Sequence, residues 1–211
     1  EKKMKKSYVY LLTTFMLWGS LYVVSQFVLG KIPTFTVAMF RYLIAFIALS
    51  LISLKSEKEK IEKSDYKYFF IMGFIGYFIS VDCQLLGTKI AGGSMASLIN
   101  SLNPVIISVM AMIILNEKLE MNKIVGIVLS LAGVYMIIGT GANIQFLGVL
   151  ISFIAVIGWA FMSVISRKIS NKYSALTLTK VSILIATICN IPVSFLEVQM
   201  THPLIQVDLG A

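Results

Sequence analysis

Polar side chains that could bind a solute or a proton are rare inside the long apolar stretches of this sequence. Tyr22, Arg41, Asp82 and Asn100 each lie about seven residues from the same end of such a stretch. At about 1.5 Å per helical residue, they share one layer about 10 Å deep. There Arg41 could hold a carboxylate, and Asp82 an amine or a coupling proton. The alternative is a structural Arg41–Asp82 pair, with Asn100 and Tyr22 as interhelical hydrogen-bond partners.

Three further residues are candidates for roles in substrate movement. Trp18 and Trp159 lie near the middle of their stretches, away from the membrane interface where tryptophan is usually found. They would stack on an apolar substrate if they line a cavity, and ordinary packing is the alternative. Pro104 removes a backbone hydrogen bond in mid-stretch, which predicts either a hinge or a static bend.

The elements that must position these residues are membrane-spanning helices. Of the 211 residues, 58% are apolar and 13% are charged, with a mean hydropathy of +0.88, which leaves no room for a separate soluble domain. Stretches of about 20 residues are long enough for helices and too long for membrane strands. The sequence predicts an all-α polytopic membrane helix bundle with seven spans, at 8–29, 34–54, 66–89, 93–115, 124–140, 146–166 and 176–197.

The distribution of positive charge predicts the orientation of the bundle. With these spans, fourteen of the 18 Lys and Arg residues fall on the side of the N-terminus, and two, Lys31 and Lys89, fall on the other. Cytoplasmic loops carry the excess of Lys and Arg, so we expect a cytoplasmic N-terminus. Topology alone then accounts for the net charge of +8, and nucleic acid is not an expected partner.

The sequence also contains a weak internal repeat. Shifting the chain by 141 positions gives nine identities between residues 18–47 and 159–188, including Trp18 on Trp159. Five spans separate the copies, and an odd number inverts the second copy in the membrane. The expectation is a complete five-helix repeat over 8–140 and an incomplete second one, with two helices, over 146–211. The remaining helices would belong to a longer chain or to another chain, such as the second copy in a homodimer.

Several motifs resemble the EamA-like family of the drug/metabolite transporter superfamily. They are Leu98–Val105 running on to Leu115–Leu119, the Trp18-Gly19 pair, Arg41, and Gly87–Ser94 before the fourth span. The resemblance implies a ten-helix, 5+5 inverted-repeat carrier for small metabolites or drugs in the bacterial inner membrane, with the lipid bilayer and a small-molecule substrate as its partners.

No enzyme or cofactor signature is present in the sequence. It lacks a phosphate-binding glycine loop, and no His, Cys and carboxylate residues have the spacing of a metal site. We therefore expect no catalysis, no cofactor and no metal. The resemblance to the EamA-like family implies secondary-active efflux by alternating access as the function. A truncated, non-transporting scaffold or partner-dependent subunit is the alternative, and a channel is disfavoured because no ring of charges or carbonyl-rich loop is evident.

Overall fold

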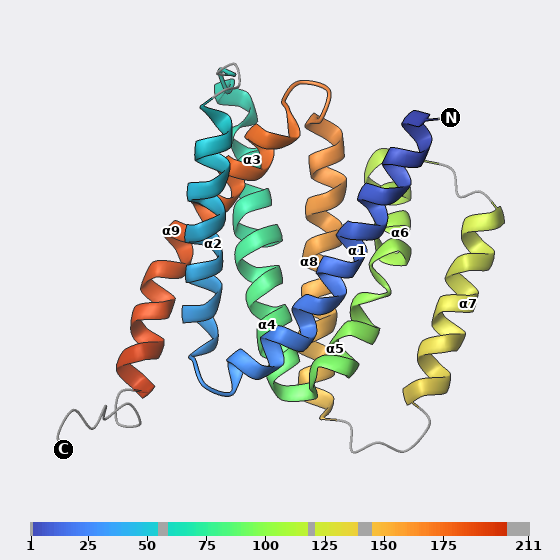
Figure 1. Cartoon of the computed structure of the whole chain (residues 1–211). Coiled ribbons are helices and arrows are strands. Elements are labelled where there is room, and N and C mark those ends of the chain that lie inside the picture. Colours follow the sequence, from blue (N-terminus) through green and yellow to red (C-terminus); the bar gives the residue numbers. More distant parts are fainter. Residues whose placement is uncertain (1, 55–58, 118–120, 139–144, 202–211) are drawn as a thin grey trace.

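The structure, a computed structural model shown in Figure 1, describes residues 2–54, 59–117, 121–138 and 145–201. Within these ranges the regular structure is helical and contains no strand. The helices are α1 (Lys2–Leu29), α2 (Thr34–Ser53), the 3₁₀ turn η1 (Lys63–Asp65), α3 (Tyr66–Ile71), the π-helix η2 (Met72–Ile79), α4 (Ser80–Ala91), α5 (Gly93–Asn100), α6 (Asn103–Leu115), α7 (Met121–Ile138), α8 (Phe146–Ile169) and α9 (Ala175–Thr201).

Six helical segments of the described residues are long and apolar enough to cross a membrane. They are Tyr8–Leu29, Thr34–Ser53, Lys63–Ala91, Gly93–Leu115, Phe146–Ile169 and Ala175–Thr201. The chain is therefore an all-helical, multi-pass membrane protein. The remaining predicted span, 124–140, overlaps α7, which is not one of the six, and its last two residues lie outside the described ranges.

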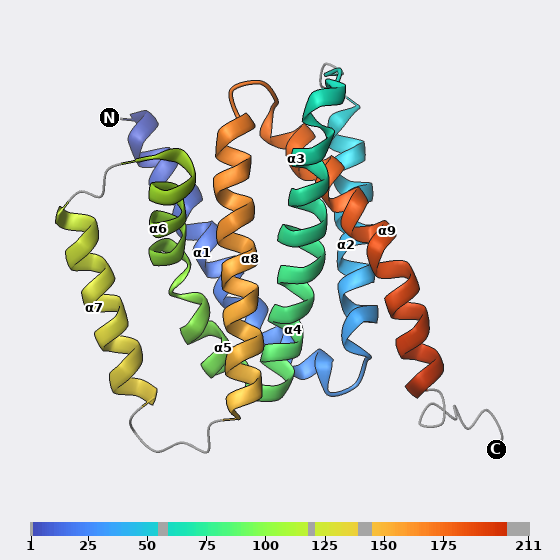
Figure 2. The same ribbon diagram turned by 180° about the vertical axis from the view of Figure 1, so that it is seen from behind.

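Helix α8 forms the centre of the bundle. It packs against α4, α6 and η2, while α2 packs along α9 and α7 lies at the edge beside α6. Figure 1 shows α1 crossing one face of the bundle obliquely, and Figure 2 shows α8, α4 and α9 on the opposite face. Large side chains such as those of Ile44 and Ile188 are exposed on the outside, as expected for helices that face lipid.

Small residues allow the central helices to approach closely. A Cβ atom added to Gly76 of η2 would lie 2.2 Å from Cγ of Met162 on α8. One added to Gly148 would lie 2.7 Å from the backbone nitrogen of Ala91. In a bilayer, where lipid is as apolar as leucine, such close packing is what holds helices together.

Two of the spans depart from a regular α-helix. The third span runs continuously through α3, η2 and α4, with the π-helix in its middle. The fourth span divides into α5 and α6, because Pro104 lies in the first turn of α6. Across this break Asn103 Nδ2 donates to Asn100 Oδ1 at 2.6 Å. The predicted bend at Pro104 is therefore present, and its action as a hinge stays a prediction.

Helices α2 and α9 are each capped at the N-terminus by a carboxylate that lies at or just after the C-terminal end of the other helix. Glu197, near the end of α9, accepts hydrogen bonds from the backbone N–H groups of Thr34, Phe35 and Thr36 at 2.7, 2.8 and 3.1 Å. Glu59, in the segment after α2, accepts from the backbone N–H of Ser174 at 3.0 Å, just before α9 begins. The two antiparallel helices thus supply each other's N-terminal caps, where the helix dipole favours an anion.

A second polar cluster joins η1 to the connection between α8 and α9. Tyr173 Oη and Lys172 Nζ donate to the buried Asp65 at 2.9 and 3.1 Å. The hydrogen bond to Asp65 raises the pKa of Lys172 above its ordinary value. These bonds fix the start of the third span against the start of α9.

Candidate functional site

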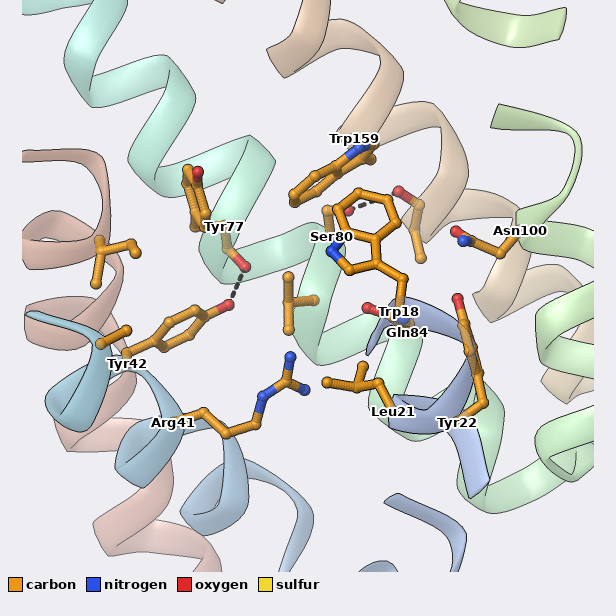
Figure 3. Close-up of a pocket in the computed structure, with 14 residues that line it drawn as sticks. Trp18, Leu21, Tyr22, Arg41, Tyr42, Tyr77, Ser80, Gln84, Asn100 and Trp159 are labelled. Atoms are coloured by element: carbon orange, nitrogen blue, oxygen red, sulfur yellow. Dashed lines mark hydrogen bonds between the residues drawn. The ribbon is translucent and has the colours of Figure 1, made fainter. Parts of the chain in front are cut away.

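The cavity that contains most of the predicted site residues, named the main cavity, lies inside the bundle and has a volume of about 220 Å³. Its walls come from α1, α2, η2, α4, α5, α8 and α9, so segments far apart in the sequence share it (Figure 3). The lining residues are Trp18, Leu21, Tyr22, Arg41, Tyr42, Ala45, Tyr77, Ser80, Val81, Gln84, Asn100, Ala155, Trp159 and Ile183. Five of the six residues predicted for a substrate cavity are among them.

One wall of the cavity is aromatic. The rings of Trp18 and Trp159 meet edge to face, with centroids 5.4 Å apart and planes at 74°. Tyr77 packs on Trp159 in the same manner, with centroids 5.8 Å apart. Spacings of three and four residues place Trp18, Leu21 and Tyr22 on one face of α1, which is why a single helix supplies three lining side chains.

Among the described residues, Arg41 is the only charged residue that lines this cavity. Figure 3 shows its guanidinium reaching into the space between Tyr42 and Leu21. Its Nη1 atom is buried and has no hydrogen-bond partner among the described residues, and the same is true of the Tyr22 hydroxyl. The cavity therefore presents two polar groups whose hydrogen bonds are not satisfied by the protein.

Two other polar lining groups donate to the backbone of neighbouring helices. The Tyr42 hydroxyl donates to the carbonyl oxygen of Tyr77, drawn as a dashed line in Figure 3. Ser80 Oγ donates to the carbonyl oxygen of Ala155 at 2.6 Å. π-Helical turns are frequent at functional sites, and here η2 carries Tyr77 and leads directly into Ser80. These bonds make the wall formed by the third span rigid.

Asp82 does not line the cavity. It is 4% exposed, and both of its carboxylate oxygens accept from Asn190 Nδ2 on α9, each at 3.0 Å. Among the described residues no ion pair joins it to Arg41, so the structural Arg41–Asp82 pair considered above is not formed. The two groups share a depth, but Asp82 faces α9 whereas Arg41 faces the cavity.

A second cavity, of about 620 Å³, adjoins the first. The two share Trp18, Tyr22, Asn100 and Trp159. Its other walls come from α1 and from the region around Pro104, including Ser97, Ser101 and Asn103. The break between α5 and α6 thus borders the space in which a solute would lie.

Sequence reasoning missed several of the residues that form the site. Tyr77, Ser80 and Gln84 recur at intervals of three and four residues, which is the spacing of one helix face and a signal that was available. Asn190 gave no such signal, because nothing in its own helix marks it as the partner of Asp82. Among the described residues no group of three His, Cys, Asp or Glu side chains is placed to hold a metal ion.

Comparison with known proteins finds relatives that are named as transporters. The chain is 29% identical over 186 residues to the uncharacterized transporter YetK of Bacillus subtilis, covering 84% of this chain and 56% of the relative. It is 22% identical over 183 residues to an uncharacterized transporter of Archaeoglobus fulgidus, covering 87% and 65%. It is 24% identical over 213 residues to the uncharacterized transporter YvbV of Bacillus subtilis, covering 97% and 70%. The chain thus spans less than two thirds of the length of the first two relatives.

The family comparison covers most of the cavity-lining helices. Residues 5–139 match the model of the EamA-like transporter family, a range that includes Trp18, Tyr22, Arg41 and Asn100. The internal cavity, the apolar helices and this match agree with one another, and the chain belongs to the EamA-like transporter family.

Proposed function

We propose that this chain forms seven helices of a ten-helix secondary-active transporter, which exports small metabolites or drugs across the bacterial inner membrane by alternating access. The observation that carries the proposal is the internal cavity between α1 and α8, bounded by Trp18 and Trp159. A scaffold that only joins other proteins would have no need for an internal cavity with polar groups left unpaired. The greater length of the relatives supports the part of the proposal that concerns ten helices.

An inverted repeat is supported by a contact between two residues related by the 141-residue shift. A residue near a two-fold axis contacts its own equivalent, and Trp18 contacts Trp159. Ser53 and Ser194 are also equivalent in the sequence. Ser194 pairs with Thr36 at 3.2 Å at one end of α2, and Ser53 accepts from Lys180 at 3.0 Å at the other end.

The exchange of helix caps fits the same symmetry. Glu197, near the end of α9, caps α2, and Glu59, in the segment after α2, caps α9. Inverted repeats of this kind can rock against each other about a site at their middle. Alternate opening of the two ends would expose the cavity first to one side of the membrane and then to the other.

Labelling of a single cysteine from each side of the membrane tests alternating access. In the full-length protein, Cys83 and Cys189 are replaced by Ala, and Gln84→Cys introduces one thiol into the cavity. A membrane-impermeant maleimide is then added to right-side-out and to inside-out vesicles. Ile44→Cys is the matched control, since Ile44 is 66% exposed on the outer surface of α2, where lipid covers it.

We expect the thiol at position 84 to react in both vesicle orientations, the thiol at position 44 to react in neither, and the vesicles to remain tight to the reagent. A scaffold would give no reaction at position 84 from either side. A channel would give reaction from both sides together with leakage of the reagent. Either result would overturn the proposed function.

A further inference from the structure

We propose that the substrate is a small monocarboxylate with a flat, apolar body, whose carboxylate binds Arg41 while its body lies against Trp18 and Trp159. This inference names the substrate class of the transporter proposed above and therefore rests on that function. It comes from three properties of the main cavity: its charge, the place of its unpaired hydrogen-bonding groups, and its aromatic wall.

The charge of the cavity favours an anion. A guanidinium is protonated at any physiological pH, and a partly buried cation without a counter-ion is destabilised by the loss of water around it. Within the described residues the lining contains Arg41 and no acid. The nearby buried acid, Asp82, is held by Asn190 on another face of α4. An anionic substrate would compensate this charge, whereas a cationic drug would be repelled by it.

The unpaired groups suit a carboxylate better than a phosphate. Arg41 Nη1 and the Tyr22 hydroxyl are both buried without a hydrogen-bond partner among the residues that the structure describes, and both residues line the cavity. Gln84 and Asn100 add neutral amides nearby. One cation and a few neutral donors match a single negative charge with two oxygens, the pairing for which arginine is well shaped. A phosphate, with up to two charges and three oxygens to satisfy, would remain undercompensated.

The remaining walls of the main cavity fit an apolar ring. The edge-to-face pair of Trp18 and Trp159 offers aromatic surface, and Leu21, Val81 and Ile183 add aliphatic surface. Aromatic rings favour edge-to-face and offset contacts with further rings. A volume of about 220 Å³ has room for a single-ring body beside Arg41, and the adjoining cavity of about 620 Å³, which shares Trp18 and Trp159, extends the space.

Binding of three probes of nearly equal shape tests the inference. The probes are 3-phenylpropionate, its neutral amide 3-phenylpropionamide, and the cation 3-phenylpropylamine, with phenylphosphate as a fourth arm. Binding is measured by calorimetry on the purified full-length protein in nanodiscs at pH 7.5. We expect the carboxylate to bind at least tenfold more tightly than the amide and the phosphate, and the amine to show no binding.

Variants of Arg41 test whether the preference for the carboxylate probe depends on this residue. Arg41→Gln should weaken binding of the carboxylate at least tenfold and leave binding of the amide unchanged, and Arg41→Lys should retain part of the preference. Leu43→Gln is the matched control, since Leu43 lies on the same helix, outside the lining, and is 40% exposed. If Arg41→Gln does not fold, the comparison of probes on the parent protein still decides the question.

Equal binding of amide and carboxylate, or tighter binding of the amine or the phosphate, would overturn the inference. Failure of all four probes to bind at millimolar concentration would overturn it as well. None of these results would overturn the proposed function. That function is tested by labelling of the thiol at position 84 from both sides of the membrane, which does not depend on the charge of the substrate.

Discussion

Removal of the carboxylate of Glu197 should destabilise the pairing of α2 with α9. In Glu197→Ala the backbone N–H groups of Thr34, Phe35 and Thr36 lose their acceptor. Thr34 is 0% exposed, so no water can replace the bond to its N–H, and an orphaned buried donor costs about 1–3 kcal/mol. The other two N–H groups are only partly buried, and the loss of an N-terminal cap there adds about 1 kcal/mol.

The expected loss for Glu197→Ala is therefore about 2–4 kcal/mol in the free energy of unfolding. It is measurable by titration with sodium dodecyl sulfate in mixed micelles, with helicity as the readout. Glu197→Gln should lose roughly half as much, because it keeps one of the two acceptor oxygens.

The matched control is Glu59→Ala, which removes the corresponding cap of α9. Glu59 and Ser174 are both exposed, so water can take over the hydrogen bonds and the loss should be clearly smaller. A loss below about 0.5 kcal/mol for Glu197→Ala would refute this reasoning, since surface changes commonly fall in that range. Equal losses for the two variants would show that burial does not set the size of the effect.

Three further predictions concern packing, coupling and topology. Gly76→Ala should cost about 1–3 kcal/mol of stability, because its Cβ would lie 2.3 Å from Cβ of Met162. Gly126→Ala should not destabilise, because among the described residues no other helix comes within 4 Å of the added Cβ, and equal melting temperatures of the two variants would contradict this. Asp82→Asn should abolish accumulation of substrate driven by a pH gradient in proteoliposomes of the full-length protein; accumulation equal to that of the parent would mean that Asp82 carries no coupling proton. A reporter fused after Lys60 should indicate the cytoplasm, and an external signal there would invalidate the predicted spans.

The lengths and limits of the helices follow from the sequence by itself. An apolar stretch of about 20 residues must be helical in a bilayer, because lipid offers no partner to a free backbone N–H or C=O. That constraint placed the third span at 66–89, inside the helical segment Lys63–Ala91, and the fourth at 93–115, the bounds that the structure has. It also anticipated the break near Pro104, since proline has no N–H to donate.

The depth of a residue also follows from sequence, but the direction of its side chain does not. Counting at a fixed rise per residue grouped Tyr22, Arg41 and Asn100 with Asp82, and the structure places the first three in one cavity. The face on which each side chain lies depends on how the helices rotate against one another. Helices that are apolar on every side give no amphipathic pattern from which this rotation could be deduced.

The π-helix at Met72–Ile79 shows why the directions of the side chains can be known only from the tertiary structure. Each i→i+5 hydrogen bond adds a residue to the turn, so every side chain beyond it is rotated relative to a regular α-helix. Asp82 lies three residues after this segment and faces Asn190 on α9. Close packing of Gly73 on Ile185 and of Gly76 on Met162 accompanies the widened turns. These contacts join residues about a hundred positions apart, and only the folded bundle brings them together.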